Sequence, residues 1–450
     1  MMNQESRERQ PFFRSRIVLL AAAVTIGFVL FSFDAPLRAI LILAAGVCGA
    51  GLFLYPELAL ALYVVGGDVK GDERVASLLP VDLTLVLGAI LAAGMALNFL
   101  RKKRFVAMPP AYFLFIAVVA LMAASLAYTP VVDAGVEKLA RFLTVTGIVI
   151  VAPFFVLGTP EAMRRFLLGF GVAAFAICAY SLGDLGGSSR LVTPSSNTIG
   201  LGHVACALIA LIWFALVPRF SFPRRMLTYP LLLVPAVALF GSGSRGPAIA
   251  LAIVIFASLF IYRRLLVDVC CLASAGLLAY PFLRVPASAI DYMSTLVRSR
   301  SAAALLSFRG ELLDYGWKLL QQHPFIGAGL QGYRYYSPNA GVYNWPHNIF
   351  LEAGCELGIP AALIVLAIFV AAIREAVRQL KDHASPFASL SRVAAALLVI
   401  GIINATNTGD INSDRSTWLF VSLVFTIRGF RSESDQPEIA PLEDARPELA

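Results

Sequence analysis

The stretch TIGLGHVACALIALIWFALVP, residues 198–218, decides the class of fold. It contains no Asp, Glu, Lys or Arg, and it is as long as the roughly 20 residues that an α-helix needs to cross a bilayer. Apolar runs recur along nearly the whole chain of 450 residues, of which 59% are hydrophobic and 14% are charged. The mean hydropathy is +0.78. Because a soluble protein of this composition would expose large apolar patches, we predict an all-α polytopic integral membrane protein.

The hydropathy pattern predicts about 12–14 transmembrane helices. We expect them at 17–33, 37–54, 58–67, 81–100, 110–128, 142–158, 166–183, 198–218, 228–242, 246–262, 265–283, 347–373, 393–408 and 415–430. The third is short, and we interpret it as a half-helix or as a tight hairpin with its neighbour. We expect a cytoplasmic segment at 1–16 and a transmembrane domain at 17–430. Residues 431–450 are polar, acidic and rich in Pro and Glu, which indicates a disordered cytoplasmic tail.

The placement of positive charge predicts the orientation of the chain. There are 36 Lys and Arg against 28 Asp and Glu, a formal net charge of +8, and short cytoplasmic loops carry the excess of Lys and Arg. With the N-terminus inside, one orientation places every basic cluster on the cytoplasmic side, namely Arg7 to Arg16, RKKR (101–104), Arg164 with Arg165, RFSFPRR (219–225), Arg263 with Arg264, REAVRQLKDH (374–383), and Arg428 with Arg431. The charge therefore reflects topology, and we expect no nucleic-acid partner.

The predicted outer face receives one large loop, residues 284–346. It joins a helix-compatible part, SFRGELLDYGWKLLQQ (307–322), to an aromatic, glycine-rich part, GAGLQGYRYYSPNAGVYNWP (327–346). Long loops in compact proteins are usually functional, because binding residues collect on loops that a rigid scaffold holds. The six cysteines lie in apolar runs, which favours packing between helices over a disulfide framework.

Two arginines on this face are candidates for binding an anion. Arg245 follows the turn GSGS (241–244) and begins a predicted helix, so its guanidinium lies beside a helix N-terminus, where phosphate binds well. The alternative is an interfacial arginine that reaches lipid headgroups. Arg309 lies in a predicted amphipathic helix, and its alternative is a surface ion pair with Glu311 or Asp314.

The stretch NWPHNIFLEAGCELGIP (344–360) brings polar residues into an apolar helix. Asn348, Glu352 and Glu356 recur every four residues and share one helix face. Carboxylates in membrane proteins face a neighbouring helix or a polar cavity rather than lipid. His347 beside them is a candidate base, proton relay or phosphate ligand. The alternative is an interfacial histidine with a packing role alone.

The remaining polar residues have simpler interpretations. His203 lies inside a predicted span, where a functional and a packing role are equally compatible with the sequence, and His323 and His383 look like ordinary loop residues. Asp410 and Asp414 precede the final helix, as helix caps do. Neither a glycine-rich nucleotide loop nor a paired His and Cys arrangement appears, so we expect no metal and no cofactor.

The second half of the chain carries a set of motifs. They are GSRGP (243–247), FRGELLDYGW (308–317), HPFIGAGLQGY (323–333) and HNIFLEAGCELGIPAAL (347–363), with weaker ones in RLVTPSSNTIG (190–200) and GDINSDRSTW (409–418). This set, which lies within about residues 185–420, resembles the O-antigen ligase and O-antigen polymerase superfamily, membrane glycosyltransferases of bacterial surface polysaccharides. The resemblance implies a GT-C-like architecture with short helices in the large periplasmic loop.

The resemblance also implies a reaction. The donor is an undecaprenyl-pyrophosphate-linked glycan, and the acceptor is a hydroxyl of a glycan or of the lipid A-core. Transfer takes place on the periplasmic face of the bacterial inner membrane, without metal or nucleotide, in the synthesis of lipopolysaccharide O-antigen, capsule or exopolysaccharide. Membrane lipids, a flippase and a chain-length regulator are the further partners that it implies.

The same resemblance assigns roles to residues. Arg245 and Arg309 bind the pyrophosphate, and we expect Asn348 to bind it as well. His347 acts at the sugar–phosphate bond, and we prefer it as base over Glu352 because it lies at the mouth of the helix. A further basic position corresponds to Arg190 in RLVTPSSN (190–197), although VTPSSN departs from the usual text, which is like GPFGNPN.

The chemistry of such a transfer fits these residue types. Negative charge builds on the departing pyrophosphate, and fixed arginines in a partly dry site stabilise it. The residues serve a ligase, which attaches a finished glycan, as well as a polymerase, which joins repeat units; the number of spans leans towards a polymerase. A transporter or lipid-linked glycan flippase is the alternative. It would need ionisable residues at the midplane and broken helices, often with repeat symmetry, whereas the charged residues here gather at the outer ends of the spans.

Overall fold

The structure is a computed structural model of the chain. It describes residues 49–70, 82–100, 106–187, 189–217, 220–263, 265–279, 285–298, 302–338 and 344–434. All regular elements in these ranges are helices, which confirms the all-α class. The predicted spans at 17–33 and most of 37–54, the segment 1–16 and the RKKR loop lie outside the described residues. The predicted tail overlaps the last helix, which ends at Ser434, and its remainder also lies outside them.

The helices follow one another along the chain with short connections. In order they are α3 (Pro56–Val65), η1 (Gly66–Asp68), α5 (Leu83–Leu100), α6 (Tyr112–Ser125), α7 (Val132–Arg141), η2 (Phe142–Thr146), α8 (Gly147–Val156), α9 (Pro160–Ser181), η3 (Leu182–Asp184), α10 (Thr198–Ala215), α11 (Phe222–Met226), α12 (Tyr229–Ser242), α13 (Arg245–Ile261), α14 (Leu265–Ala279), α15 (Ala287–Arg298), α16 (Ala302–Gln322), α17 (Gly332–Tyr336), α18 (Ile349–Leu357), α19 (Ile359–Lys381), α20 (Ala388–Asn407) and α21 (Arg415–Ser434).

Among the described residues, six helices are long and apolar enough to cross a membrane. They are Leu83–Leu100, Val132–Val156, Pro160–Asp184, Thr198–Ala215, Ile359–Lys381 and Ala388–Asn407. Four shorter apolar helices accompany them, at Tyr112–Ser125, Tyr229–Ser242, Arg245–Phe260 and Leu265–Gly276. The chain is therefore a multi-pass membrane protein, as its hydropathy predicts.

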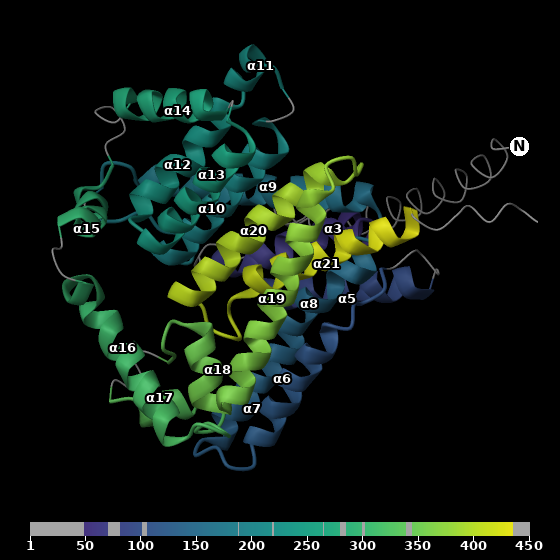
Figure 1. The fold of residues 1–450 in the computed structure, drawn as a ribbon, viewed down its shortest axis with the longest axis vertical. Helices are drawn as coiled ribbons and strands as arrows, with labels where there is room; N and C mark the ends of the chain where they lie inside the picture. Colours follow the sequence, from purple (N-terminus) through teal and green to yellow (C-terminus); the bar gives the residue numbers. More distant parts are fainter. Residues whose placement is uncertain are drawn as a thin grey trace, which may run out of the picture.

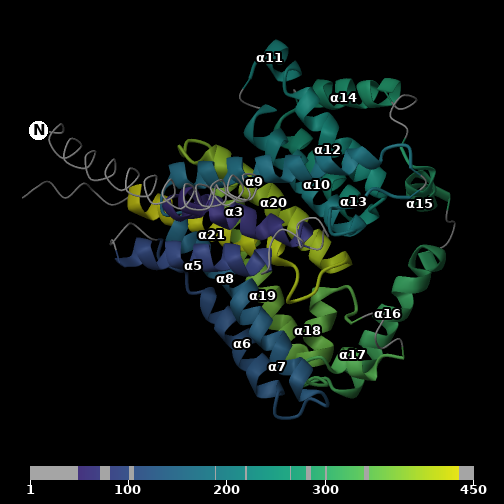
Figure 2. The same cartoon turned by 180° about the vertical axis from the view of Figure 1, so that it is seen from behind.

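The stretch at 198–218 forms the centre of one helical group. Its helix, α10, packs against α9, α12, α13 and α20, and these helices lie together in the upper part of Figure 1. Most of the α10 side chains are buried, including Trp213, whose indole donates a hydrogen bond to Ser258 on α13. Seen from behind, α3 lies between α9 and α5, which it contacts (Figure 2). Helices α6, α7, α16, α17 and α18 extend away from this group.

The structure corrects one prediction, the single span at 347–373. Two helices, α18 and α19, meet at Gly358, whose φ is +91°, a value that side chains rarely adopt. A Cβ on Gly358 would lie 2.2 Å from the Phe325 carbonyl oxygen, and one on Gly327 would lie 2.2 Å from the Glu356 carbonyl carbon. The amide of Ile359 donates to Pro324 O (2.8 Å). The motifs HPFIGAG and ELGIP therefore contain glycines because two backbones touch there.

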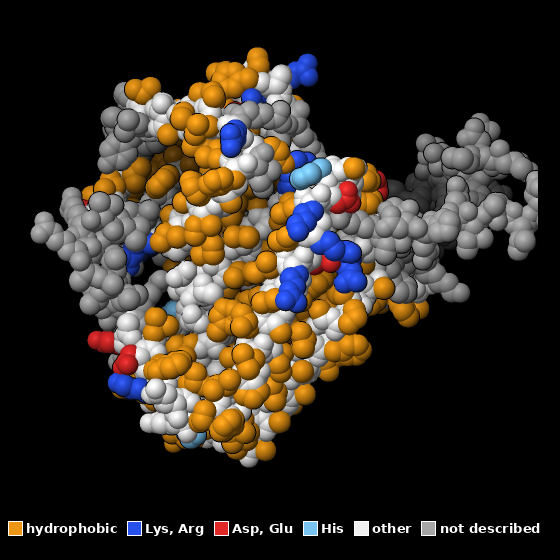
Figure 3. Space-filling model, in the orientation of Figure 1, with side chains coloured by type: hydrophobic (Ala, Val, Ile, Leu, Met, Phe, Trp, Pro, Cys, Tyr) orange, Lys and Arg blue, Asp and Glu red, His pale blue; other side chains and the backbone are white. Residues whose placement is uncertain are grey.

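Helix α19 separates two chemically different ends of the molecule. It contains 23 residues, so it is about 34 Å long, close to the thickness of a bilayer core. Its first residue follows α18, whereas its last turn carries Arg378 and Lys381. Figure 3 shows hydrophobic side chains over much of the surface around α19, with Lys and Arg side chains gathered where α19 and α20 are joined. This basic end is the one predicted to be cytoplasmic.

Candidate functional site

A small pocket lies where two helices begin. It is formed at the N-terminal ends of α10 and α13, beside the C-terminal end of α20, and its lining residues are Arg190, Thr198, Ile199, Ser244, Arg245, Gly246, Pro247 and Thr408. The segments that form it are distant in the sequence. The structure thus brings two of the predicted anion-binding arginines, Arg190 and Arg245, to one place.

The two helix starts are joined to each other. Asn197 caps α10 by accepting a hydrogen bond from the amide of Gly200 (2.9 Å), and Ser244 precedes α13. The Ser244 hydroxyl donates to the carbonyl oxygen of Thr198 (2.8 Å). The N-terminus of a helix carries a partial positive charge and unpaired amides, which bind anions. Two such ends therefore favour negative charge at this pocket.

A tight turn places the arginines around these helix starts. Gly243 lies between α12 and α13 in the left-handed conformation, with φ +64°, and a Cβ there would be 3.0 Å from Arg190 Nε and 3.3 Å from Ala289 Cα. Arg190 Nε donates to the carbonyl oxygen of Ser242 (2.6 Å). Arg245 is the first residue of α13. Both arginines are half-buried, and guanidinium groups match phosphate oxygens in geometry and charge.

Thr408 connects the pocket to two histidines. Its hydroxyl oxygen lies 3.1 Å from His203 Nε2 on α10, and its carbonyl oxygen lies 3.4 Å from His347 Nδ1. The hydroxyl also donates to the carbonyl oxygen of Asn404 (3.0 Å). His347 and His203 therefore lie on either side of a residue that lines the pocket.

The contacts of Thr408 bear on the tautomers of the two imidazoles. Its hydroxyl can donate to His203 Nε2 or accept from it, according to the tautomer of His203. Its carbonyl oxygen can only accept, so a hydrogen bond from His347 Nδ1 requires a hydrogen on that atom. In a neutral ring the lone pair of His347 is then on Nε2, the atom that can take a proton.

His347 has an unusual backbone conformation. Its φ is +57°, in the left-handed region that few residues other than glycine adopt, although histidine does so more often than most. Asn348 follows as the N-cap of α18, and its side-chain oxygen accepts from the amides of Phe350 and Leu351, each at 3.0 Å. Its Nδ2 donates to the carbonyl oxygen of Thr406 (3.0 Å). Asn348 is thus held at both ends of its amide by the protein itself.

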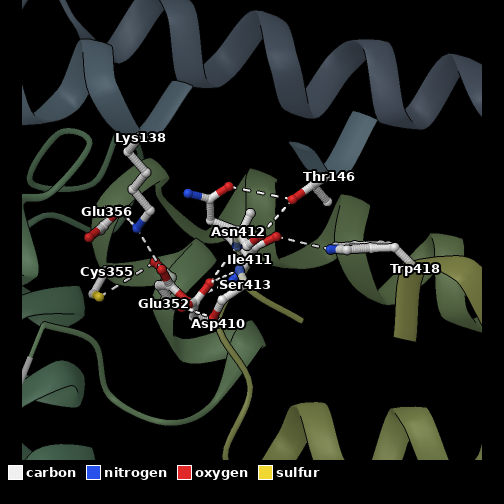
Figure 4. A network of polar contacts seen from close by, with 10 residues as sticks. All are labelled: Lys138, Thr146, Glu352, Cys355, Glu356, Asp410, Ile411, Asn412, Ser413 and Trp418. Carbon is white, nitrogen blue, oxygen red and sulfur yellow. Dashed lines mark hydrogen bonds and ion pairs between the residues drawn. The ribbon is translucent and has the colours of Figure 1, made fainter. Parts of the chain in front are cut away.

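Glu352 lies in a buried network rather than at the pocket. Its two oxygens accept from Lys138 Nζ (2.5 Å) and from the amide of Ile411 (2.9 Å), and Glu356 also accepts from Lys138 (2.7 Å). Figure 4 shows Lys138 reaching towards the two glutamates, with Ile411 beside Glu352. Burial raises the pKa of Glu352, and the nearby ammonium opposes this rise. Both oxygens of the Glu352 carboxylate therefore accept hydrogen bonds from other parts of the protein.

The other predicted residues have clear positions. Arg309 lies on α16, and its side chain is outside the described residues. Asp410 accepts from the amides of Asn412 and Ser413, each at 2.5 Å, so it shapes the turn before α21. In the described part of the chain, no group of three His, Cys, Asp or Glu side chains could hold a metal ion.

Two residues of this region were missed by the sequence reasoning. Lys138 lies in YTPVVDAGVEKLAR (128–141), between the predicted spans 110–128 and 142–158, and it is 5% exposed. A lysine in the predominantly apolar helix 132–156 was the available signal, because such a charge needs a partner. Thr408 stands in a polar run of similar residues, and nothing local distinguishes it.

Comparison with known proteins agrees with this geometry. Residues 230–366 match the family model described as O-antigen ligase. This segment of the chain is similar to O-antigen ligases. The matched residues include Arg245, Arg309 and His347, whereas Arg190 and Thr408 join the pocket from outside the O-antigen ligase segment. A comparison with curated proteins gave no match.

The family places the chain in a functional class. The match supports an enzyme of the glycosyltransferase type, as O-antigen ligases are, for the part of this membrane protein that residues 230–366 form.

Proposed function

We propose that the chain transfers a glycan from undecaprenyl pyrophosphate to a sugar hydroxyl of an acceptor, on the periplasmic face of the bacterial inner membrane. The observation that supports this most is the pocket, where Arg190, Arg245 and the N-termini of α10 and α13 surround one small space. A diphosphate is the group in this reaction that needs positive charge on several sides.

The reaction divides between the pocket and His347. The acceptor oxygen forms a bond to the anomeric carbon while the bond from that carbon to the diphosphate oxygen breaks, and the electron pair leaves with the diphosphate. Guanidinium groups and helix N-termini fixed in place stabilise this leaving charge. His347 Nε2 takes the proton of the acceptor hydroxyl, since Nδ1 carries a hydrogen towards the Thr408 carbonyl.

Two further residues belong to the proposal. Arg309 on α16 supplies another guanidinium to the diphosphate, in the helix that precedes the HPFIGAG turn. Asn348 acts next to the reacting groups by fixing the start of α18 and hence the backbone of His347. The apolar helices hold the lipid tail of the donor in the bilayer, and the exposed Tyr335 and Tyr336 offer aromatic rings to the glycan.

The two ends of α19 support the proposed orientation. Arg378 and Lys381 lie at its C-terminal end, and His347 precedes α18 at the other. Because cytoplasmic ends of membrane helices carry Lys and Arg, the pocket side faces the periplasm. Labelling of a single cysteine, introduced at Ser413 in a chain otherwise free of cysteine, with a membrane-impermeant maleimide tests this. Labelling from the cytoplasmic side alone contradicts the proposal.

The activity is tested with purified protein in liposomes that contain a lipid-linked glycan donor and an acceptor glycan or lipid. We expect Arg245→Met to lower the transfer rate about 10- to 100-fold, because a charged hydrogen bond to the leaving group is lost. Arg141→Met is the matched control, since the Arg141 side chain is exposed and forms its ion pair with the exposed Glu137. Equal rates for both variants and the wild type would rule out the assigned phosphate site.

The products distinguish a polymerase from a ligase. In cells that lack the gene, short single repeats on the acceptor lipid indicate loss of a polymerase. Long glycans that remain on the carrier lipid indicate loss of a ligase. Normal surface glycans in the deletion strain, and normal glycans when Arg245, Arg309 and His347 are each replaced by Ala, would refute a role as a glycosyltransferase.

A further inference from the structure

Glu352 connects three parts of the fold. It lies on α18, one turn after Asn348, and it accepts hydrogen bonds from Lys138 on α7 and from the amide of Ile411. Ile411 belongs to the segment 408–414, which joins α20 to α21. Both glutamate and lysine are buried, so these contacts are shielded from water.

We propose that Glu352, held by Lys138, is a positioning residue that fixes the segment 408–414 against α18 and thereby sets the place of His347. The proposal deepens the proposed function, on which it rests for the role of His347. It gives Glu352 a task different from that of a catalytic base, and it brings in Lys138, to which the sequence assigned no role.

Contacts just before α18 support this. Asn348 Nδ2 donates to the carbonyl oxygen of Thr406 in the last turn of α20 (3.0 Å), and His347 Nδ1 lies 3.4 Å from the carbonyl oxygen of Thr408, the first residue of the segment. One turn further along, Glu352 accepts from the Ile411 amide (2.9 Å). The contact at Glu352 involves a full charge in a buried place, so it is the strongest of these. Losing it lets the helix start and the segment shift relative to each other.

Lys138 offsets the free-energy cost of burying the Glu352 carboxylate. A buried carboxylate needs a paired cation and hydrogen-bond donors for its oxygens. Lys138 supplies the cation to Glu352 and to Glu356. The two glutamates differ in their further contacts: among the hydrogen bonds of the described residues, those of the Glu356 side chain do not reach the segment 408–414.

This difference supplies a matched pair of variants. Glu352→Gln and Glu356→Gln make the same chemical change at sites that are 1% and 0% exposed, and each leaves Lys138 one carboxylate partner. At position 352 the two donors are Lys138 and the amide of Ile411, which belongs to the segment 408–414. The amide of glutamine offers one acceptor oxygen, so either Lys138 or the Ile411 amide loses its partner.

The experiment measures the segment and the reaction separately. We expect hydrogen exchange in the peptide that covers 408–414 to accelerate at least tenfold in Glu352→Gln, and to stay within threefold of the wild type in Glu356→Gln. For transfer, kcat falls about 100-fold in Glu352→Gln, as a misplacement near 1 Å can cause. KM for the lipid-linked donor stays within threefold, because the arginines are unmoved.

Further variants guard against loss of folding and against a catalytic role. Glu352→Asp keeps the charge but shortens the side chain, and we expect it to share the kcat loss of Glu352→Gln. We expect Lys138→Met to show this loss of kcat as well, whereas Lys318→Met, on the exposed face of α16, should leave kcat unchanged. The profile of kcat against pH should keep the shape of the wild-type profile in Glu352→Gln, with both its acidic and its alkaline limb, since the base is still His347. Loss of a limb would show that Glu352 itself exchanges the proton.

The outcomes are separable. If folded Glu352→Gln or Glu352→Asp protein shows unchanged exchange in 408–414, or if Glu356→Gln impairs kcat and exchange equally, the positioning role is overturned. If the wild type shows no transfer at all, the proposed function fails, and the exchange comparison still decides whether Glu352 holds the segment.

Discussion

Replacing His347 separates its chemistry from its backbone conformation. Its φ of +57° costs an ordinary L-residue roughly 1–2 kcal/mol, whereas asparagine adopts this conformation more easily. Both His347→Ala and His347→Asn remove the imidazole and its contact with Trp345, whose ring centroid is 5.3 Å away. They differ in what the backbone then costs. Alanine should therefore be the less stable of the two, by roughly 1 kcal/mol.

Transfer should not follow this order of stability. A general base contributes about 10²- to 10⁴-fold, which corresponds to roughly 2.7–5.5 kcal/mol of barrier. Asparagine has no basic nitrogen, so His347→Asn should lose this factor even though its fold is kept. The Thr408 carbonyl can still accept from the asparagine amide, which preserves the local contact in part.

The two quantities are measured on the same samples. Initial transfer rates at saturating lipid-linked donor report the chemical step, and thermal unfolding followed by tryptophan fluorescence in the same detergent reports stability. A His347→Asn protein that keeps transfer within threefold of the wild type would refute the base. An active Asn variant beside an inactive, unstable Ala variant would show that residue 347 acts through the shape of the chain before α18.

Other variants test the surrounding geometry. Gly358→Ala should abolish the folded protein, because its Cβ would lie 2.2 Å from Phe325 O at a φ of +91°. Gly276→Ala on α14, where a Cβ would have nothing within 4 Å, should be neutral or stabilise the protein by up to about 1 kcal/mol. Equal yields of monodisperse protein for the two variants would contradict this. Asn348→Ser keeps a capping oxygen but loses the amide donor to α20, so the free energy of unfolding should fall by about 1 kcal/mol, and an unchanged unfolding midpoint argues against that contact. Thr408→Val should lower kcat roughly tenfold because it removes the pocket-lining hydroxyl that contacts His203, whereas Thr408→Ser should retain most activity. Identical rates for the two variants would speak against a role for this hydroxyl.

The helices could be predicted from the sequence because hydropathy is a local property. The predicted span 198–218 became α10 (Thr198–Ala215), and the expected start at 246 became α13 at Arg245. The break at Gly358 was missed because ELGIP stays apolar on both sides of the glycine. Hydropathy averages across such a point, whereas φ and the approach of Phe325 depend on a loop that precedes it by about 30 residues.

The part of the site that depends on charge and on helix N-termini could be predicted from the sequence. Arg245 after a Gly and Ser turn indicated an anion site, and the structure places Arg190 beside it. The relation between Lys138 and Glu352 could not be predicted, because residues 214 positions apart pair only once α7 and α18 are packed. Their spacing along the chain contains no trace of it. The helix face with Asn348, Glu352 and Glu356 was predicted to meet a neighbouring helix or a polar cavity, and the structure gives each of the three residues different partners.

The hydrogen bond from Ser244 to Thr198 has a consequence for turnover. It joins two helix ends before any substrate arrives, so the positive charge there has nothing to rearrange when the sugar departs. Such a site attracts the carrier diphosphate after transfer as strongly as the glycan-bearing donor before it. Escape of undecaprenyl pyrophosphate, rather than bond cleavage, would then limit the cycle, and added carrier diphosphate would act as an inhibitor that competes with the donor.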